Sequence, residues 1–310
     1  MSSRLTRSAL AAASALTVLA VAACSSSDQP STGSGSASNA AAQPASAGKI
    51  KVVASTDVWG SVVSAVGGDK VEVKSIIHDP SADPHSYETT ADDALAAKGA
   101  QLLLSNGGGY DEFFGKLTEQ ASSAKKLVAY DIAATGDENE HVWYDLPGVD
   151  KVADQVAAQL GELQPAAKQQ FSDNATAFKA KVDALEKRLE ELGAAHPGTK
   201  VVVTEPVAHY LLASAKITDA TPKAFSDAVE NDTDVPADAV SAYKQLIATK
   251  QVKALINNEQ TVTPLTQDVV KQAKETGIGV VGVTETLPAG VADYIGWMTG
   301  EVDELAGALK

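Results

Sequence analysis

Two histidines and two glutamates have the side-chain chemistry of a metal site. His85 lies in a loop stiffened by prolines, and His141 stands just before a helical pattern. Glu205 and Glu285 each follow a short apolar run in the second half of the chain. Imidazole nitrogens and carboxylate oxygens together suit Zn(II), Mn(II) and Fe(II). The four residues are far apart in the sequence, and an isolated histidine or glutamate is more often a surface residue, so only the fold can decide between the two interpretations.

The elements that must position these side chains are short apolar runs alternating with helical patterns. Runs with strand character are 50–55, 71–77, 101–105 and 126–130, followed by 200–204, 253–256 and 279–283. This alternation predicts parallel strands covered by helices on both faces. Glu205 and Glu285 then lie at the carboxyl ends of strands in one sheet, where both can point into one crevice. The acidic stretch 223–238 is interpreted as a surface excursion.

One long helix, from about Ala166 to Gly193, is predicted between the two groups of strands. Its apolar residues recur every three or four positions and define one buried face. They are Phe171, Phe178, Val182, Leu185, Leu189 and Leu192. Gly193, with Pro197 after it, is interpreted as the helix stop. The predicted fold class is α/β, with two βα lobes of small, mainly parallel sheets joined by one long rigid helix.

The amino-terminal segment is predicted to be an export signal and a tether. Residues 1–23 combine two arginines with an apolar stretch that is short for a membrane span, which is typical of a signal peptide. Val21-Ala22-Ala23-Cys24 resembles the lipobox of bacterial lipoproteins, which implies lipid on Cys24. Residues 24–48 are rich in Ser, Ala and Gly and are predicted to be a disordered tether. The expected domains that follow are an N-terminal lobe (49–148), a helical connector (149–197) and a C-terminal lobe (198–310).

Composition narrows the possible partners. The formal net charge is −15 and only 5% of the residues are aromatic, which argues against binding to nucleic acid or anionic lipid surfaces and is compatible with collecting cations. Cys24 is the single cysteine, so the chain has neither an internal disulfide nor a cysteine-based zinc cluster. No nucleophile motif of the GxSxG type is present.

Six stretches resemble one family, the ZnuA/TroA-like solute-binding lipoproteins of bacterial zinc and manganese ABC importers. They are the opening strand 51–55, Asp83-Pro84-His85-Ser86-Tyr87-Glu88, the strand end 104–107, Tyr110-Asp111-Glu112-Phe113, His141-Val142-Trp143-Tyr144-Asp145 and Thr204-Glu205-Pro206. The resemblance covers nearly everything after the tether. It implies metal ligation by His85, His141, Glu205 and Glu285. Glu259 matches an acidic position of the family and is interpreted either as a residue behind the ligands or as a surface acid.

This resemblance also implies a function. The expected protein is not an enzyme; it is a monomer that binds one Mn(II) or Zn(II) ion with high affinity as cargo. It delivers the ion to the membrane permease of an ABC importer while lipid on Cys24 holds it at the outer face of the cytoplasmic membrane. Two departures from the family pattern are the glutamate at position 205, where zinc-type members often have histidine, and Glu285, where aspartate is common. Two imidazoles with two carboxylates move the expectation towards manganese.

Three other functions stay open at this stage. A metal-dependent hydrolase needs an open coordination position and a general base, a binding protein for a small organic solute needs a larger cleft, and a surface adhesin needs no metal. His209 follows Glu205 by one helical turn and could replace it as a ligand, although a half-exposed helix residue is favoured.

Overall fold

Two four-stranded parallel sheets share one topology. In the computed structural model, which describes residues 48–80, 87–119 and 121–310, the strand orders are β2-β1-β3-β4 and β6-β5-β7-β8. The strands are β1 (Ile50–Thr56), β2 (Val71–Ile77), β3 (Leu102–Ser105), β4 (Lys125–Val128), β5 (Lys200–Val203), β6 (Thr218–Asp219), β7 (Ala254–Asn258) and β8 (Gly279–Val283). Every strand pairing is parallel. The direction of crossover reverses between β1 and β3 and between β5 and β7, which is where α/β sheets open a binding crevice.

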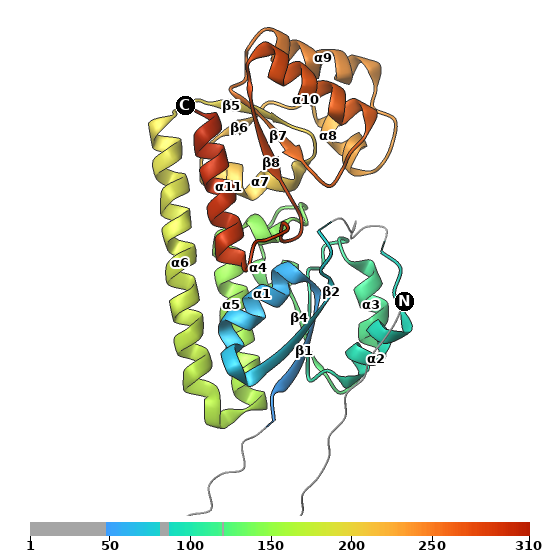
Figure 1. The fold of residues 1–310 in the computed structure, drawn as a ribbon, viewed down its shortest axis with the longest axis vertical. Helices are drawn as coiled ribbons and strands as arrows, with labels where there is room; N and C mark the ends of the chain where they lie inside the picture. The colour runs from blue at the N-terminus through green and yellow to red at the C-terminus, as the bar shows by residue number, and fades with distance from the viewer. Residues whose placement is uncertain (1–47, 81–86, 120) are drawn as a thin grey trace, which may run out of the picture. The chain divides into compact units, whose positions relative to one another are not determined.

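Helices connect these strands and link the two lobes (Figure 1). The first lobe contains α1 (Asp57–Gly67), α2 (Ala91–Gly99), α3 (Glu112–Glu119) and α4 (Ala129–Ala133), and α5 (Leu146–Leu163) and α6 (Lys168–Ala195) follow it. The second lobe contains α7 (His209–Ser214), α8 (Lys223–Glu230), α9 (Ala237–Ala248), α10 (Pro264–Thr276) and α11 (Tyr294–Ala308). None of the helices within the described ranges is long and apolar enough to span a bilayer.

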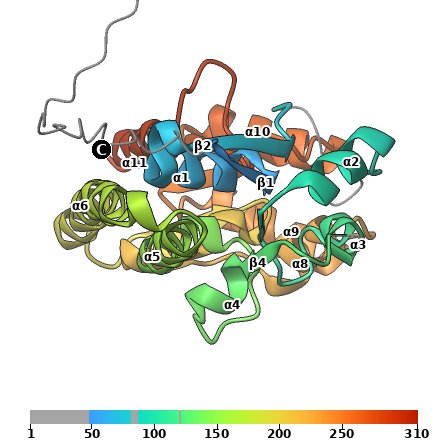
Figure 2. The ribbon, with the colours of Figure 1, turned by 90° about the horizontal axis from the view of Figure 1, so that it is seen from below.

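The long helix α6 forms because its apolar stripe packs on one side. Phe171, Phe178, Val182, Leu185 and Leu189 are buried, together with Ala175, whereas Leu192 is half-buried. The stripe contacts α5, α1 and α11, and Figure 2 shows α5 and α6 side by side. The prediction of two parallel-sheet lobes joined by a long helix is therefore confirmed.

One apolar core runs through both lobes. The largest cluster of buried residues begins at Ile50 in β1, continues through α5 and α6, and includes Val201 in β5 and Leu309 after α11. Because the interior of a protein is close-packed, a continuous core restricts the motion of one lobe against the other. The lobes are thus supported by a packed scaffold, in contrast to a pair of lobes joined by a flexible linker.

The sequence analysis misassigned two segments, one predicted as a strand and one as a surface excursion. The fourth strand ends at Val128 and Ala129 begins α4, because an apolar run of this length can belong to a strand or to a buried helix. The stretch 223–238 is not only a surface excursion, because it begins with α8. Phe225 in α8 is fully buried and stacks on Tyr243 of α9 with ring centroids 4.0 Å apart.

Gly193 does not stop α6, which continues to Ala195. Because it has no side chain, Gly193 allows α6 and the end of α7 to lie close together. A Cβ atom at position 193 would lie 1.9 Å from the carbonyl oxygen of Ala215. The glycine therefore lets the backbone of the second lobe contact the helix directly.

We expect Gly193→Ala to lower the free energy of unfolding by about 1–3 kcal/mol, because the backbone must move to accept the methyl group. Gly300→Ala is the matched control. Gly300 also lies inside a helix, α11, and a Cβ atom there meets nothing within 4 Å. The control should be neutral or gain up to about 1 kcal/mol from helix propensity. Urea unfolding measures both variants, and equal effects would contradict the close approach.

A buried glutamate in α11 makes stability depend on pH. Glu301 is 6% exposed, and its Oε1 accepts a hydrogen bond of 2.9 Å from Nε1 of Trp297. Burial raises the pKa of Glu301 from 4.5 to about 8, with smaller increases from the charges of Glu304 and Glu259. The folded protein therefore retains this proton at pH values where the unfolded chain has lost it.

The free energy of unfolding should consequently fall as the pH rises from 4.5 towards 8, by roughly 1 kcal/mol per pH unit for this group, and level off above 8. Glu301→Gln should reduce the slope by this amount, because glutamine cannot ionise. Exposed Glu119, at the end of α3, provides the control Glu119→Gln, which should keep the slope. Chemical unfolding of metal-free protein between pH 5 and 9 is the measurement, with an unchanged slope in Glu301→Gln as the contradicting result.

Candidate metal centre

The ring of His141 is fixed by the amide of Asn139. His141 is fully buried and precedes a short 3₁₀ turn, Val142–Tyr144. Oδ1 of Asn139 accepts the backbone N–H of His141 at 2.9 Å, and Nδ2 of Asn139 donates to the carbonyl of Pro206 at 2.9 Å. These two bonds fix the orientation of the amide, so its oxygen is the atom 3.1 Å from Nδ1 of His141. An amide oxygen only accepts, so Nδ1 carries a proton, and in the neutral form of the ring the lone pair is on Nε2.

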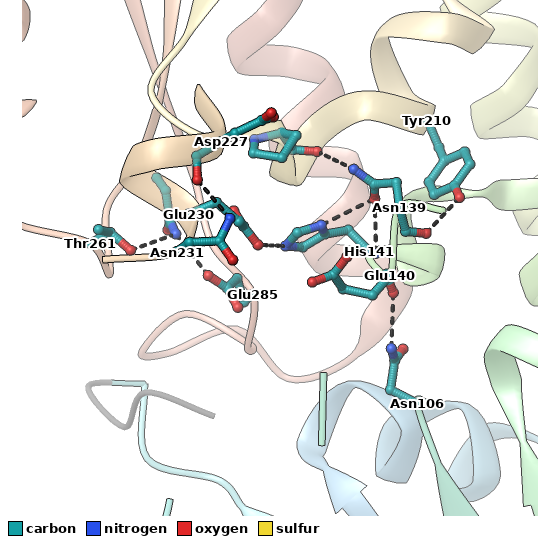
Figure 3. A network of polar contacts seen from close by, with 12 residues as sticks. Asn106, Asn139, Glu140, His141, Tyr210, Asp227, Glu230, Asn231, Thr261 and Glu285 are labelled. Atoms are coloured by element: carbon teal, nitrogen blue, oxygen red, sulfur yellow. Dashed lines mark hydrogen bonds and ion pairs between the residues drawn. The ribbon is translucent and has the colours of Figure 1, made fainter. Parts of the chain in front are cut away.

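Two glutamates lie beside that ring. Oε1 of Glu230, the last residue of α8, is 3.6 Å from Nε2 of His141. Glu140 completes a group of three residues whose ligand atoms all lie within 4.8 Å of one another (Figure 3). The backbone oxygen of Glu140 accepts a hydrogen bond from Nδ2 of Asn106, which follows β3. This group therefore connects the carboxyl end of β3, where the direction of crossover reverses in the first sheet, with the C-terminal end of α8.

Glu205 and Glu285 come from the second sheet. Glu205 follows β5 in an extended conformation and is 6% exposed. Glu285 follows β8 and is 5% exposed; its Oε1 accepts a hydrogen bond of 2.7 Å from Nδ2 of Asn258. Asn258 ends β7, and its backbone N–H donates to Oγ1 of Thr204. One asparagine thus ties together the ends of the strands that carry both glutamates.

The electrostatics of the centre favour a cation. Burial, together with the smaller effect of the negative charges of Glu205, Glu140 and Glu285, raises the pKa of Glu230 to about 9. Such mutual repulsion shows that these carboxylates share one electrostatic environment. A divalent ion would reverse it, because an opposite charge close to a buried carboxylate favours the ionised form.

The structure describes three of the four ligands expected from the sequence, His141, Glu205 and Glu285, and all three are buried. Among the described residues, the group whose ligand atoms lie within 4.8 Å of one another contains His141 but neither of these two glutamates. His85 and Cys24 lie outside the described residues. Glu259 is exposed, and its neighbours Asn258 and Gln260 contact Glu285.

His209, which the sequence left open as a possible ligand, has a different partner. His209 forms an ion pair of 3.3 Å with Asp137, and its side chain is 44% exposed.

Sequence reasoning missed Asn139, Glu140 and Glu230. Asn139 and Glu140 are adjacent to His141, and an asparagine two residues before a histidine was the available signal, since asparagine side chains often bind the backbone nearby. Glu230 had no comparable signal. It lies in an acidic stretch, and only the docking of α8 on α9 places it beside His141.

Solved structures with the same fold include a periplasmic metal-binding protein. The periplasmic zinc-binding protein TroA from Treponema pallidum superposes with a TM-score of 0.70, at 19% identity, over 84% of this chain and 99% of TroA. Residues 52–308 match the family model described as the periplasmic component A of the zinc-uptake complex (ZnuA), and the chain belongs to this family.

Curated relatives include two streptococcal lipoproteins. The manganese ABC transporter substrate-binding lipoprotein PsaA of Streptococcus anginosus is 27% identical over 57% of this chain and 58% of PsaA. The iron ABC transporter substrate-binding lipoprotein MtsA of Streptococcus pyogenes serotype M1 is 26% identical over 54% of this chain and 59% of MtsA. These matches therefore span somewhat more than half the length of each relative. The resemblance inferred from the sequence motifs is confirmed, and the family consists of substrate-binding proteins.

The orientation of the Asn139 amide can be tested directly. We expect the ¹⁵N chemical shifts of His141 in the metal-free protein to report a ring protonated at Nδ1, because Nδ1 faces an acceptor. Asn139→Ala removes that acceptor and should produce a mixture of the two tautomers. Asn174→Ala is the control, since Nδ2 of Asn174 bonds the carbonyl of Val66 far from this ring. A ring protonated only at Nε2 in the native protein would contradict the assignment.

Proposed function

We propose that this protein binds one divalent transition-metal ion outside the cytoplasmic membrane and delivers it to the permease of an ABC importer. The observation that carries the proposal is the geometry at His141: Nδ1 faces the amide oxygen of Asn139, and Nε2 lies 3.6 Å from Oε1 of Glu230, a carboxylate that is itself influenced by the charges of Glu205 and Glu285. Imidazole with several carboxylates is a ligand set for Mn(II), Fe(II) and Zn(II). PsaA and MtsA are substrate-binding lipoproteins of manganese and iron ABC transporters, and this likeness supports the same class of cargo.

The proposed ligands are His85, His141, Glu205 and Glu285. Support for His85 comes from the residues that flank its segment. The carbonyl of Pro80 accepts a hydrogen bond of 3.1 Å from Nε2 of Gln260, whose Oε1 accepts the backbone N–H of Glu285. Gln260 therefore links Pro80, five residues before His85 in the sequence, to the backbone of one proposed ligand.

The remaining parts of the proposal concern the whole protein. A signal peptide (1–23) directs export, lipid on Cys24 anchors the chain to the membrane, and residues 24–48 form the tether. The N-terminal lobe (49–148) and C-terminal lobe (198–310), joined by the helical connector (149–197), act together as a monomer with the metal between them. The ABC permease takes the ion from the loaded form.

The ligand set favours manganese among the candidate cargoes. Carboxylates are harder ligands than imidazoles and bind through one or two oxygens, so they accommodate the larger coordination numbers that Mn(II) accepts. Zn(II) binds most nitrogen and oxygen sites more tightly than Mn(II), so geometry and supply decide which ion is carried in the cell. We propose Mn(II) as the cargo, with Zn(II) as its competitor.

Metal titration tests the function. Protein stripped with a chelator should bind one equivalent of Mn(II) or Zn(II), and at a free concentration of 100 times the Kd the ion should add about 2.7 kcal/mol to the free energy of unfolding. Mg(II) should have little effect, because it retains its water and prefers fewer protein ligands. Calorimetry and thermal unfolding measure these effects.

Substitutions identify the ligands in the same assay. His85→Ala, His141→Ala and Glu205→Ala should each weaken binding more than 100-fold, because each removes a donor from a buried ion. His78→Ala and His209→Ala are the matched histidine controls and should leave the Kd unchanged. Stabilisation by a small organic solute, or the absence of any stoichiometric metal, would instead favour a solute-binding or adhesive function. Measurable hydrolysis lost with His85→Ala would favour the hydrolase.

A further inference from the structure

We propose that Glu230 is an additional ligand of the metal and makes the site selective for manganese over zinc. This inference rests on the proposed function, since it concerns the same ion. The expected set of two histidines and two glutamates does not include Glu230. With it, the second lobe would supply three carboxylates to the ion.

The distance between Glu230 and His141 suits two ligands of one ion. Metal–nitrogen and metal–oxygen bonds in protein sites are about 2.0–2.2 Å, so two ligand atoms on a tetrahedral ion lie roughly 3.4 Å apart and those on an octahedral ion roughly 3 Å apart. Oε1 of Glu230 and Nε2 of His141 are 3.6 Å apart. This is too long for a good hydrogen bond, and a small rotation of the glutamate side chain would bring it to the metal-bound separation.

The ionised form of the Glu230 carboxylate is unfavourable at this position unless a cation is bound nearby. Its side chain is 15% exposed, and within the described residues Oε1 has no hydrogen-bond partner. Glu230 is also the last residue of α8, at the negative end of the helix dipole. Burial, neighbouring carboxylates and the helix terminus all disfavour an anion here, and a divalent ion at Nε2 of His141 would offset all three.

The backbone around Glu230 is fixed by packing. Phe225 and Val229 of α8 are buried against the second lobe, and the backbone N–H and Nδ2 of Asn231 both donate to the carbonyl of Asp227. Figure 3 shows Glu230 directed from the end of α8 towards the ring of His141, with Glu285 on the same side. The glutamate therefore reaches the centre from a rigid element, and this restricts where its oxygens can lie.

A further carboxylate changes which metal fits. Zn(II) is satisfied by four ligands in a tetrahedron, so a fifth donor adds little to its binding. Mn(II) accepts more oxygen ligands and should gain from each one. Removing the charge of Glu230 should thus weaken Mn(II) binding more than Zn(II) binding.

The test compares Glu230→Gln with the native protein in competitive titrations of Mn(II) and Zn(II). We expect the Kd for Mn(II) to rise 10- to 100-fold and the Kd for Zn(II) to rise less than fivefold. X-ray absorption of the Mn(II) form should show one fewer oxygen or nitrogen neighbour in the variant. Glu138→Gln, at an exposed acid close to His141 in the sequence, is the matched control and should change neither constant.

Glu230→Asp separates direct ligation from a general effect of charge. Aspartate keeps the charge but is one methylene shorter, so a ligand role predicts weakened Mn(II) binding, whereas a purely electrostatic role predicts native affinity. The melting temperature of metal-free Glu230→Gln should not fall, which excludes misfolding as the cause.

Three results would overturn the inference: unchanged Kd values in Glu230→Gln, equal weakening for both metals, or native Mn(II) affinity in Glu230→Asp. If the native protein itself binds neither metal, the proposed function fails, and that outcome is distinct from a failure of Glu230 alone.

Discussion

The amide of Asn139 is the contact on which the centre depends. It accepts two hydrogen bonds from His141, donates to the carbonyl of Pro206 directly after Glu205, and its own backbone oxygen accepts the hydroxyl of Tyr210 in α7. A single residue thus fixes the tautomer of the histidine and ties its loop to the second lobe. Outer-shell partners of this kind commonly account for 10- to 100-fold of metal affinity, which is on the order of 1–3 kcal/mol. Because both lobes contribute to the same amide, the ring cannot turn without loosening the contact between them.

The scaffold explains why such a contact can be maintained. Tyr294 of α11 donates to the carbonyl of Trp143, and Tyr144 donates to the carbonyl of Thr284, so the turn after His141 is bonded to the second lobe on both sides. The apolar core also continues through α5 and α6 into both sheets. A hinge motion between the lobes would therefore have to rearrange a packed interior. Small movements of the loops that carry the proposed ligands would cost less free energy when an ion binds.

Much of the fold could be predicted from sequence because it follows from periodicity. The buried stripe of α6 and the β-branched runs of β2 and β8 are patterns that burial imposes directly on sequence. Glu205 and Glu285 could be identified because residues at the carboxyl ends of parallel strands share one edge of a sheet. Glu230 could not, because its approach to His141 depends on how α8 docks, which no local pattern encodes. Gly193 was misread for a similar reason, since a glycine that permits close packing has the same sequence appearance as one that ends a helix.

The arrangement of charge connects the structure to delivery of an ion. His141 belongs to the first lobe and its connector, whereas Glu205, Glu230 and Glu285 belong to the second lobe. In the proposed function, an ion bound between them would be attracted by groups from both lobes and would displace the proton that burial and the neighbouring carboxylates favour on Glu230 in the metal-free protein. A ligand shifts an equilibrium between two forms only by its difference in affinity for them. The carboxylates would supply such a difference, because they would bind the ion more strongly when both lobes contribute ligands.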